Sequence, residues 1–180
     1  MRNAIKVALA AAAVAALYIV GAGASISTPT VGDQGKAPDF VGIDKWLNSQ
    51  PLNMEKLRGK VVLVDFWTYS CINCVNTLPY VKQWYEKYKD QGLVVVGVHT
   101  PEFPFEKSTS NVEAAIKRFG ITYPVAQDNN YATWSAYSNQ YWPATYLINA
   151  DGKIVYKHYG EGAYKETESV IQKLLSERKQ

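Results

Sequence analysis

Two nearly continuous apolar runs mark the centre of the chain. Residues 61–67 and 93–98 consist mainly of valine and leucine, and a single charged residue, Asp65, interrupts the first run. Strands of a parallel sheet are buried on both faces and read as continuous apolar runs, whereas half-exposed strands alternate. We therefore expect two buried parallel strands here.

The segments around these runs have the apolar spacing of helices. Apolar side chains recur every three or four residues over 75–88, which predicts a helix directly after the first strand. A second helix is expected over 112–119, with Asn111 as its N-cap and Gly120 just after its last turn. An amphipathic helix over 166–179 closes the chain.

The remaining segments predict short strands. Apolar runs over 144–149 and 154–159 flank the turn Asp151-Gly152 and predict a β-hairpin. Residues 121–126 are expected to form a short strand, and residues 39–57 a short N-terminal hairpin and loop. This order of elements predicts an α/β fold with a mixed central sheet flanked by helices.

The N-terminus has the pattern of a targeting segment. Arg2 and Lys6 precede an uncharged apolar stretch from Val7 to Ala24, a little shorter than the roughly 20 residues that span a bilayer. We expect residues 1–24 to be a signal peptide or a membrane anchor; both alternatives place the rest of the chain outside the cytoplasm. Polar residues 25–36 would form a flexible linker, and residues 37–180 a single domain.

The charge of the chain is nearly balanced. Nineteen basic and 16 acidic residues give a formal net charge of +3. No basic run is interleaved with aromatic residues, so nothing in the composition favours binding to a phosphate backbone. We expect no nucleic-acid partner.

The only two cysteines of the chain, Cys71 and Cys74, follow directly on the first apolar run. A C-x-x-C sequence where a strand gives way to a helix is typical of a thiol/disulfide redox centre. Residues three apart on a helix are neighbours, so the two sulfurs can form and break a disulfide. At the helix start, backbone N–H groups and the helix dipole would favour the Cys71 thiolate, which makes Cys71 the expected nucleophile and Cys74 the resolving thiol.

Other uses of the two cysteines are weighed against redox chemistry. A structural disulfide closing four residues would stabilise the fold by only about 2 kcal/mol. A metal site would need His99 and His158 as further ligands, and no second pair has the spacing of a zinc finger. A copper-binding module using Cys71, Cys74 and His99 remains an alternative, because these are soft ligands suited to Cu(I).

Polar residues follow the second predicted strand. His99, Glu102 and Glu106 lie just beyond its carboxyl end, where the sites of α/β proteins gather. His99 could tune the thiols, or it could be a loop residue that makes one hydrogen bond.

Two stretches resemble the thioredoxin family. Residues 64–74, with Pro79 five residues after the second cysteine, resemble the thioredoxin active-site strand and its kinked helix. Residues 142–148, followed by the turn at 151–153, resemble the cis-proline strand and the hairpin after it. The resemblance runs from Ala37 to the C-terminus and implies a thioredoxin fold.

Additional features are similar to a subgroup of that family. The chain between Cys74 and Pro143 is longer than in a minimal thioredoxin, which implies an insertion there. Together with the N-terminal hairpin and the leader, this insertion is similar to the exported TlpA/ResA-like thioredoxins. Residues 97–103 resemble the C-terminal domain of DipZ-like proteins.

The resemblance implies a function and a set of roles. The protein would be a thiol:disulfide oxidoreductase acting on exported proteins through Cys71 and Cys74. It would work as a monomeric reductase that receives electrons from a membrane thiol donor and needs no cofactor beyond its redox-active disulfide. Pro143 would be cis and packed beside Cys71, leaving a backbone edge free for a client peptide. Trp67, Tyr69 and Trp142 are expected to line this client site; the alternative for Trp67 is simple packing in the core.

Asp65 has two interpretations. Burying a carboxylate costs stability, so a buried one is expected either to take part in catalysis or to form an ion pair. The resemblance implies that Asp65 accepts the Cys74 proton, with a pKa raised by desolvation. The alternative is an ion pair with a lysine such as Lys60 or Lys82.

The sequence departs from the family in two places, and one further enzymatic alternative stays open. Ile72-Asn73 stands where thioredoxins have Gly-Pro, so their redox potential does not carry over, and Trp142 is bulkier than the usual residue before the proline.

Thr68 precedes Cys71 at the spacing of the peroxiredoxin nucleophile loop, which leaves a thioredoxin-like peroxidase as an alternative. Val64, however, stands where that loop has proline.

Overall fold

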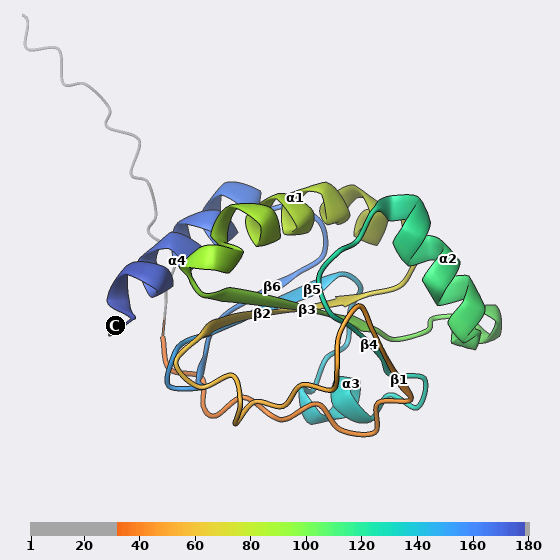
Figure 1. Ribbon diagram of the computed structural model, residues 1–180, viewed down its shortest axis with the longest axis horizontal. Helices are drawn as coiled ribbons and strands as arrows, with labels where there is room; N and C mark the ends of the chain where they lie inside the picture. The colour runs from red at the N-terminus through yellow and green to blue at the C-terminus, as the bar shows by residue number, and fades with distance from the viewer. Residues whose placement is uncertain (1–31, 179–180) are drawn as a thin grey trace, which may run out of the picture.

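The computed structural model describes residues 32–178, which form one mixed sheet with helices on both faces (Figure 1). The expected leader over 1–24, and residues 25–31 of the expected linker, lie outside the described residues. Within the described part, no helix is both long enough and apolar enough to cross a membrane.

The elements follow the expected order closely. The strands are β1 Lys45–Leu47, β2 Val61–Trp67, β3 Leu93–His99, β4 Val125–Gln127, β5 Ala144–Ile148 and β6 Ile154–Tyr159. The α-helices are α1 Ile72–Tyr88, α2 Thr109–Phe119, α3 Ala132–Ala136 and α4 Tyr164–Glu177, and two short 3-10 helices are η1 Lys89–Gln91 and η2 Pro104–Lys107.

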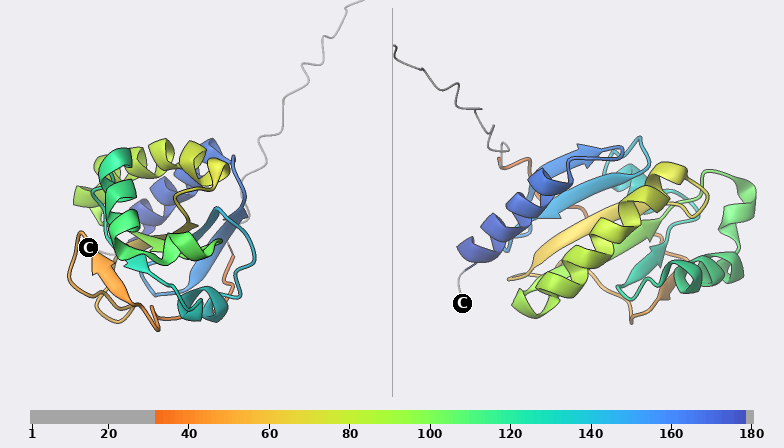
Figure 2. Two further views of the ribbon diagram at one scale, coloured as in Figure 1. Left: turned by 90° about the vertical axis from the view of Figure 1, so that its right-hand side faces the viewer. Right: turned by 90° about the horizontal axis from the view of Figure 1, so that it is seen from above.

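Strand β2 lies near the centre of the sheet, whose order is β1-β4-β3-β2-β5-β6. It pairs parallel with β3 and antiparallel with β5, and all seven of its residues are buried. Helices α1 and α4 run along one face of the sheet, whereas α3 and the chain before β2 cover the other (Figures 1 and 2). The continuous apolar run is therefore explained by cover on both sides, as expected.

Alternate residues of β2 enter two separate cores. Leu63 and Trp67 belong to the core under α1 and α4, whereas Val64 and Phe66 belong to the core on the other face. Because side chains alternate along a strand, Asp65 points to the same face as Leu63 and Trp67. The charged residue of the central strand therefore faces α1.

The insertion expected between Cys74 and Pro143 is present. After β3 the chain forms η2, α2, β4 and α3 before it reaches β5, and β4 adds to the sheet parallel to β3. Helix α2 begins at Thr109, earlier than expected. Its N-cap is Ser108, whose hydroxyl accepts from the Asn111 N–H at 3.4 Å, so the prediction of Asn111 as the cap is wrong. Gly120 ends the helix with φ 61°, as predicted.

The prediction of an N-terminal hairpin over residues 39–57 is wrong. This stretch contains only β1, which pairs antiparallel with β4 rather than with a neighbour in sequence. The reason is that the outer edge of β4 would otherwise have unpaired backbone N–H and C=O groups, and the short β1 pairs with them.

Residues 32–36 also lie against the sheet. The Gln34 N–H donates to the carbonyl of Ile154 at 2.9 Å, and the Ile154 N–H donates to the carbonyl of Gly35 at 2.9 Å. These bonds place the segment along the outer edge of β6. The packed part of the chain therefore begins before the expected boundary at Ala37.

Candidate active site

Cys71 occupies the N-cap of α1. Strand β2 ends at Trp67, and after a short turn Cys71 adopts an extended conformation with φ −73° and ψ 114°. Its half-buried sulfur accepts a hydrogen bond from the backbone N–H of Cys74 at 3.3 Å. A cysteine at a helix N-cap satisfies N–H groups that otherwise have no partner, and this interaction favours the thiolate.

The two thiols differ in acidity and in access. The hydrogen bond from the Cys74 side chain lowers the pKa of Cys71 to about 7, with help from the backbone N–H groups of Cys74 and Asn73; burial and the charge of Glu102 act in the opposite direction. Cys74 is buried, and this burial, together with the hydrogen bond to Cys71, raises its pKa far above the ordinary value. At neutral pH, Cys71 is therefore the thiol that ionises.

Asp65 lies in the middle of β2 and is 1% exposed. Burial raises the pKa of its carboxyl to about 7, and the charge of Cys71 adds to this effect. Its Oδ1 atom has no hydrogen-bond partner among the described residues. The charge of Asp65 in turn contributes to the raised pKa of Cys74, so ionisation of the carboxyl disfavours the Cys74 thiolate.

The ion-pair alternative for Asp65 is wrong. Lys82 donates instead to the carbonyl of Phe119 at 2.6 Å. None of the ion pairs within residues 32–178 involves Asp65, with Lys60 or with any other cation. An unpaired buried carboxylate is held at a cost to stability, which is expected where the group serves chemistry.

The peptide bond between Trp142 and Pro143 is cis, as predicted, and Pro143 is buried just before β5. The Trp142 indole N–H donates to the carbonyl of Thr100 at 3.0 Å. Trp142, Tyr69 and Cys71 are partly buried and pack against the same core, the one under α1 and α4. The fold thus gathers these side chains around the carboxyl end of β2.

Trp67 does not line this surface. Its side chain is fully buried and packs edge-on against His99, with ring centroids 5.2 Å apart. The expectation that Trp67 contacts a client is therefore wrong, because the last position of the central strand still lies in the core under α1 and α4. Tyr69, two residues further on, is partly exposed.

His99 is buried and neutral at physiological pH. Burial lowers its pKa to about 4, although the charge of Glu106 acts in the opposite direction. Its Nε2 atom lies 3.3 Å from the Thr68 hydroxyl, and its ring stacks on Tyr69. In the part of the chain that the structure describes, no three His, Cys, Asp or Glu side chains are grouped as metal ligands, so His99 and the two thiols do not form the set that a copper site needs.

Glu106 is the main feature of the site to which the sequence assigned no role. Its fully buried carboxylate accepts from the Ser70 hydroxyl at 2.6 Å and from the Ser70 N–H at 3.3 Å. It also accepts from the backbone N–H groups of Glu102 at 2.6 Å and Phe103 at 2.9 Å. The only sequence signal was its place after the carboxyl end of β3.

Exposed aromatic side chains lie on the loop that Tyr69 contacts. Phe105 is 55% exposed and stacks on Phe103, with ring centroids 5.6 Å apart. The Tyr69 hydroxyl donates to the Phe105 carbonyl at 3.1 Å. Ile72, between the two cysteines, is 67% exposed. Exposed apolar groups around a reactive group suit the binding of an apolar polypeptide segment.

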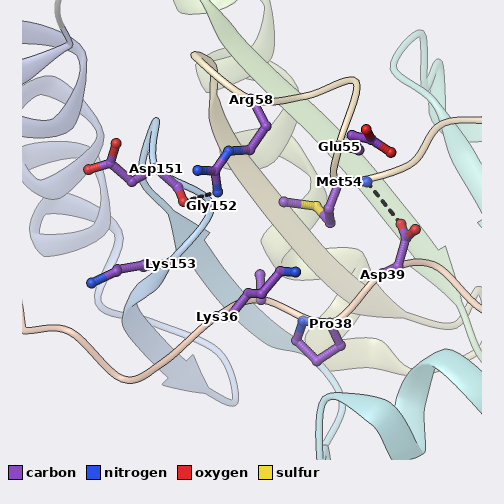
Figure 3. A pocket seen from close by; sticks show the side chains of 10 residues that line it. Lys36, Pro38, Asp39, Met54, Glu55, Arg58, Asp151, Gly152 and Lys153 are labelled. Atoms are coloured by element: carbon purple, nitrogen blue, oxygen red, sulfur yellow. Dashed lines mark hydrogen bonds between the residues drawn. The ribbon is translucent and has the colours of Figure 1, made fainter.

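A cavity of about 900 Å³ lies elsewhere in the molecule (Figure 3). Its lining includes Lys36, Arg58 and Gly152. Arg58 precedes β2 and Cys71 follows it, so the cavity is at the opposite end of the central strand from the thiols. It takes no part in the site described here.

The family model for Redoxin matches residues 30–175. Protein DipZ of Mycobacterium tuberculosis (strain CDC 1551 / Oshkosh) is 53% identical over 148 residues, which are 81% of this chain and 21% of that protein. The chain thus spans about a fifth of the length of the DipZ proteins it matches.

Two further relatives are matched over most of their length. Thiol-disulfide oxidoreductase ResA of Bacillus cereus is 31% identical over 139 residues, 77% of this chain and 76% of ResA. The solution structure of a thioredoxin-like protein in the oxidised form superposes with a TM-score of 0.73 at 30% identity, covering 80% of this chain and 97% of the other.

Proposed function

The chain belongs to the redoxin family of thioredoxin-fold thiol-disulfide oxidoreductases, and we propose that it reduces disulfides in exported proteins through Cys71 and Cys74. The observation that carries this proposal is the asymmetry of the two thiols. A partly exposed Cys71 with a pKa of about 7 lies at a helix start, above a buried Cys74 whose pKa is raised. An attacking thiol is most effective when its pKa is near the ambient pH.

The reaction proceeds in two exchanges. The Cys71 thiolate attacks one sulfur of the client disulfide, which forms a mixed disulfide and releases the other client sulfur as a thiolate. Cys74 then loses its proton to Asp65, and its thiolate attacks the Cys71 sulfur, which breaks the mixed disulfide and releases the second client sulfur as a thiolate. The products are a Cys71–Cys74 disulfide and a client dithiol, so two electrons pass from the protein to the client.

Asp65 suits the role of proton acceptor. A general base works best when its pKa lies near the operating pH, and burial raises the pKa of Asp65 to about 7. Mixed-disulfide formation also removes the Cys71 charge, which is one of the groups that raise the pKa of Asp65.

The client and the electron donor follow from two other features. The leader pattern of residues 1–24 supports a location outside the cytoplasm, where disulfides form and persist. The exposed side chains of Ile72, Phe103 and Phe105 support an apolar client segment. A membrane thiol donor would return the Cys71–Cys74 disulfide to the dithiol, because outside the cytoplasm the glutathione and thioredoxin pools that reduce disulfides are absent.

A redox titration of the purified protein tests the direction of the reaction. The fraction of the Cys71–Cys74 disulfide is measured in buffers of defined potential, beside an insulin-reduction assay. A reductase predicts a midpoint near thioredoxin's value of about −270 mV and rapid insulin reduction. A midpoint near about −120 mV would instead identify an oxidant.

A further inference from the structure

The carboxylate of Glu106 joins two segments that are far apart in sequence. On one side it accepts two hydrogen bonds from Ser70, the residue directly before Cys71. On the other side it accepts the backbone N–H groups of Glu102 and Phe103, which belong to the loop between β3 and α2. Four donors converge on one side chain with no exposed surface.

This arrangement keeps Glu106 ionised. Burial raises the pKa of its carboxyl, but the hydrogen bonds that the carboxylate accepts, above all from Ser70, outweigh burial and leave the pKa below the ordinary range. Hydrogen bonds to an ionised acceptor are roughly twice as strong as neutral ones. The link between Ser70 and the loop is therefore rigid at neutral pH.

We propose that Glu106 is a positioning residue for Cys71: it holds Ser70, and thereby keeps the Cys71 sulfur at the N-cap of α1. The inference rests on the proposed function, in which Cys71 is the nucleophile. A turn between a strand and a helix lies outside the hydrogen-bond ladders of both elements, so a side-chain contact can supply a constraint there. Glu106 supplies it one residue before the reactive sulfur.

The positioning effect is separable from a simple charge effect. The groups that act electrostatically with Cys71 are Asp65 from β2, Cys74 from α1 and Glu102 from the loop. If Glu106 acted by its negative charge, its removal would favour the Cys71 thiolate. If it acts by position, its removal lets the sulfur leave the N-cap, and the thiolate becomes less favoured.

The experiment measures alkylation of Cys71 by iodoacetamide as a function of pH in the fully reduced protein. Glu106→Gln removes the charge and replaces one carboxylate oxygen with an amide nitrogen, which cannot accept a hydrogen bond. Ser70→Ala removes one bond to Glu106 and leaves the charge in place. Glu113→Gln removes an exposed acidic group on α2 and is the matched control.

The proposal predicts that Glu106→Gln moves the alkylation midpoint from near pH 7 toward about 8.5, so that the thiolate fraction, and with it the rate at pH 7, falls by up to about sixteenfold. Ser70→Ala should move it in the same direction by less, and Glu113→Gln should not move it. A lower midpoint in Glu106→Gln with no change in Ser70→Ala would show a charge effect and overturn the proposal.

Unchanged midpoints in both variants, with lower stability in denaturant melts, would reduce Glu106 to a structural role and also overturn it. Should Glu106→Gln fail to fold, the shift in Ser70→Ala alone decides. Because alkylation needs no client and no electron donor, failure of the reductase assignment leaves this measurement unaffected, and the two outcomes are distinguishable.

Discussion

The sulfur of Cys71 accepts the backbone N–H of Cys74 at 3.3 Å, so the two cysteines are joined through the first turn of α1 even in the dithiol state. This geometry gives one sulfur access to clients and keeps the other covered. In the proposed mechanism, attack by Cys71 and resolution by Cys74 would therefore need no rearrangement of the helix.

Replacing Cys74 with serine should trap clients. The variant retains the Cys71 thiolate but cannot resolve the mixed disulfide, so client–protein adducts accumulate. Non-reducing gels and mass spectrometry of the purified variant mixed with disulfide-containing clients detect these adducts. Cys71→Ser is the control and should form none; equal trapping by both variants would contradict the assignment of roles.

Replacing Asp65 with asparagine should stabilise the fold at pH 8. The folded pKa of about 7 lies above the ordinary value of about 3.9. The native state is therefore favoured at low pH, and the penalty of the buried carboxylate grows as pH rises from about 4 to about 7. We expect Asp65→Asn to raise the free energy of unfolding by about 1 to 3 kcal/mol at pH 8 and by less at pH 5.

The same variant should slow thiol/disulfide turnover, because Cys74 loses its proton acceptor. Denaturant melts at pH 5 and pH 8, run beside insulin reduction, measure both effects. A less stable variant with unchanged turnover would rule out the catalytic role of Asp65.

His99 should make the fold sensitive to acid. Its folded pKa of about 4 lies below the ordinary value of about 6.5, so the unfolded chain binds a proton that the native state excludes. Stability is lost as pH falls from about 6.5 toward 4. Wild type should lose about 2 to 3 kcal/mol more than His99→Gln between pH 7 and pH 4. Denaturant melts across this range test the prediction, and parallel profiles would refute it.

Phe105 and Trp67 should respond in opposite ways to truncation. Phe105→Ala should change the free energy of unfolding by no more than about 0.5 kcal/mol yet raise the KM for client reduction, because the side chain is exposed beside Tyr69. Trp67→Ala should cost about 3 to 5 kcal/mol of stability, as for other buried tryptophans.

The exposed Val41 on the loop before β1 provides the control for Phe105. Val41→Ala should alter neither KM nor stability appreciably. Equal KM values for Phe105→Ala and wild type would show that Phe105 does not contact the client.

The prediction that residues 1–24 place the domain outside the cytoplasm is tested with reporter enzymes fused to its C-terminus. An alkaline phosphatase fused after Gln180 should be active, because this enzyme folds only where disulfides form, outside the cytoplasm. A cytoplasmic reporter such as β-galactosidase at the same position is the complement and should be inactive. The reverse pattern would refute the export of this domain.

The sequence predicts the part of the site that depends on local pattern. The apolar run before Cys71 and the helical spacing after it determine a strand and a helix, and these two elements place both thiols. Position 65 stands out because a lone carboxylate interrupts that run.

Long-range contacts could not be predicted in the same way. Trp67 is buried in a core that includes Tyr123, which the insertion brings from another part of the chain. The role of Glu106 depends on a contact with Ser70, 36 residues away. The partner of β1 is β4 rather than a sequence neighbour. In each case the deciding interaction is set by the packing of distant segments and not by local periodicity.

The hydrogen bonds between residues 32–36 and β6 protect the sheet from other chains. A strand at the border of a sheet offers unpaired N–H and C=O groups that can recruit a strand from another molecule and seed aggregation. Here residues 32–36 occupy those groups at the start of β6, as the bonds to Ile154 and Val155 show. A domain trimmed to Ala37, the boundary suggested by composition alone, would keep its thiols but expose this border. We expect such a trimmed domain to lose solubility at high concentration before it loses thiol/disulfide activity.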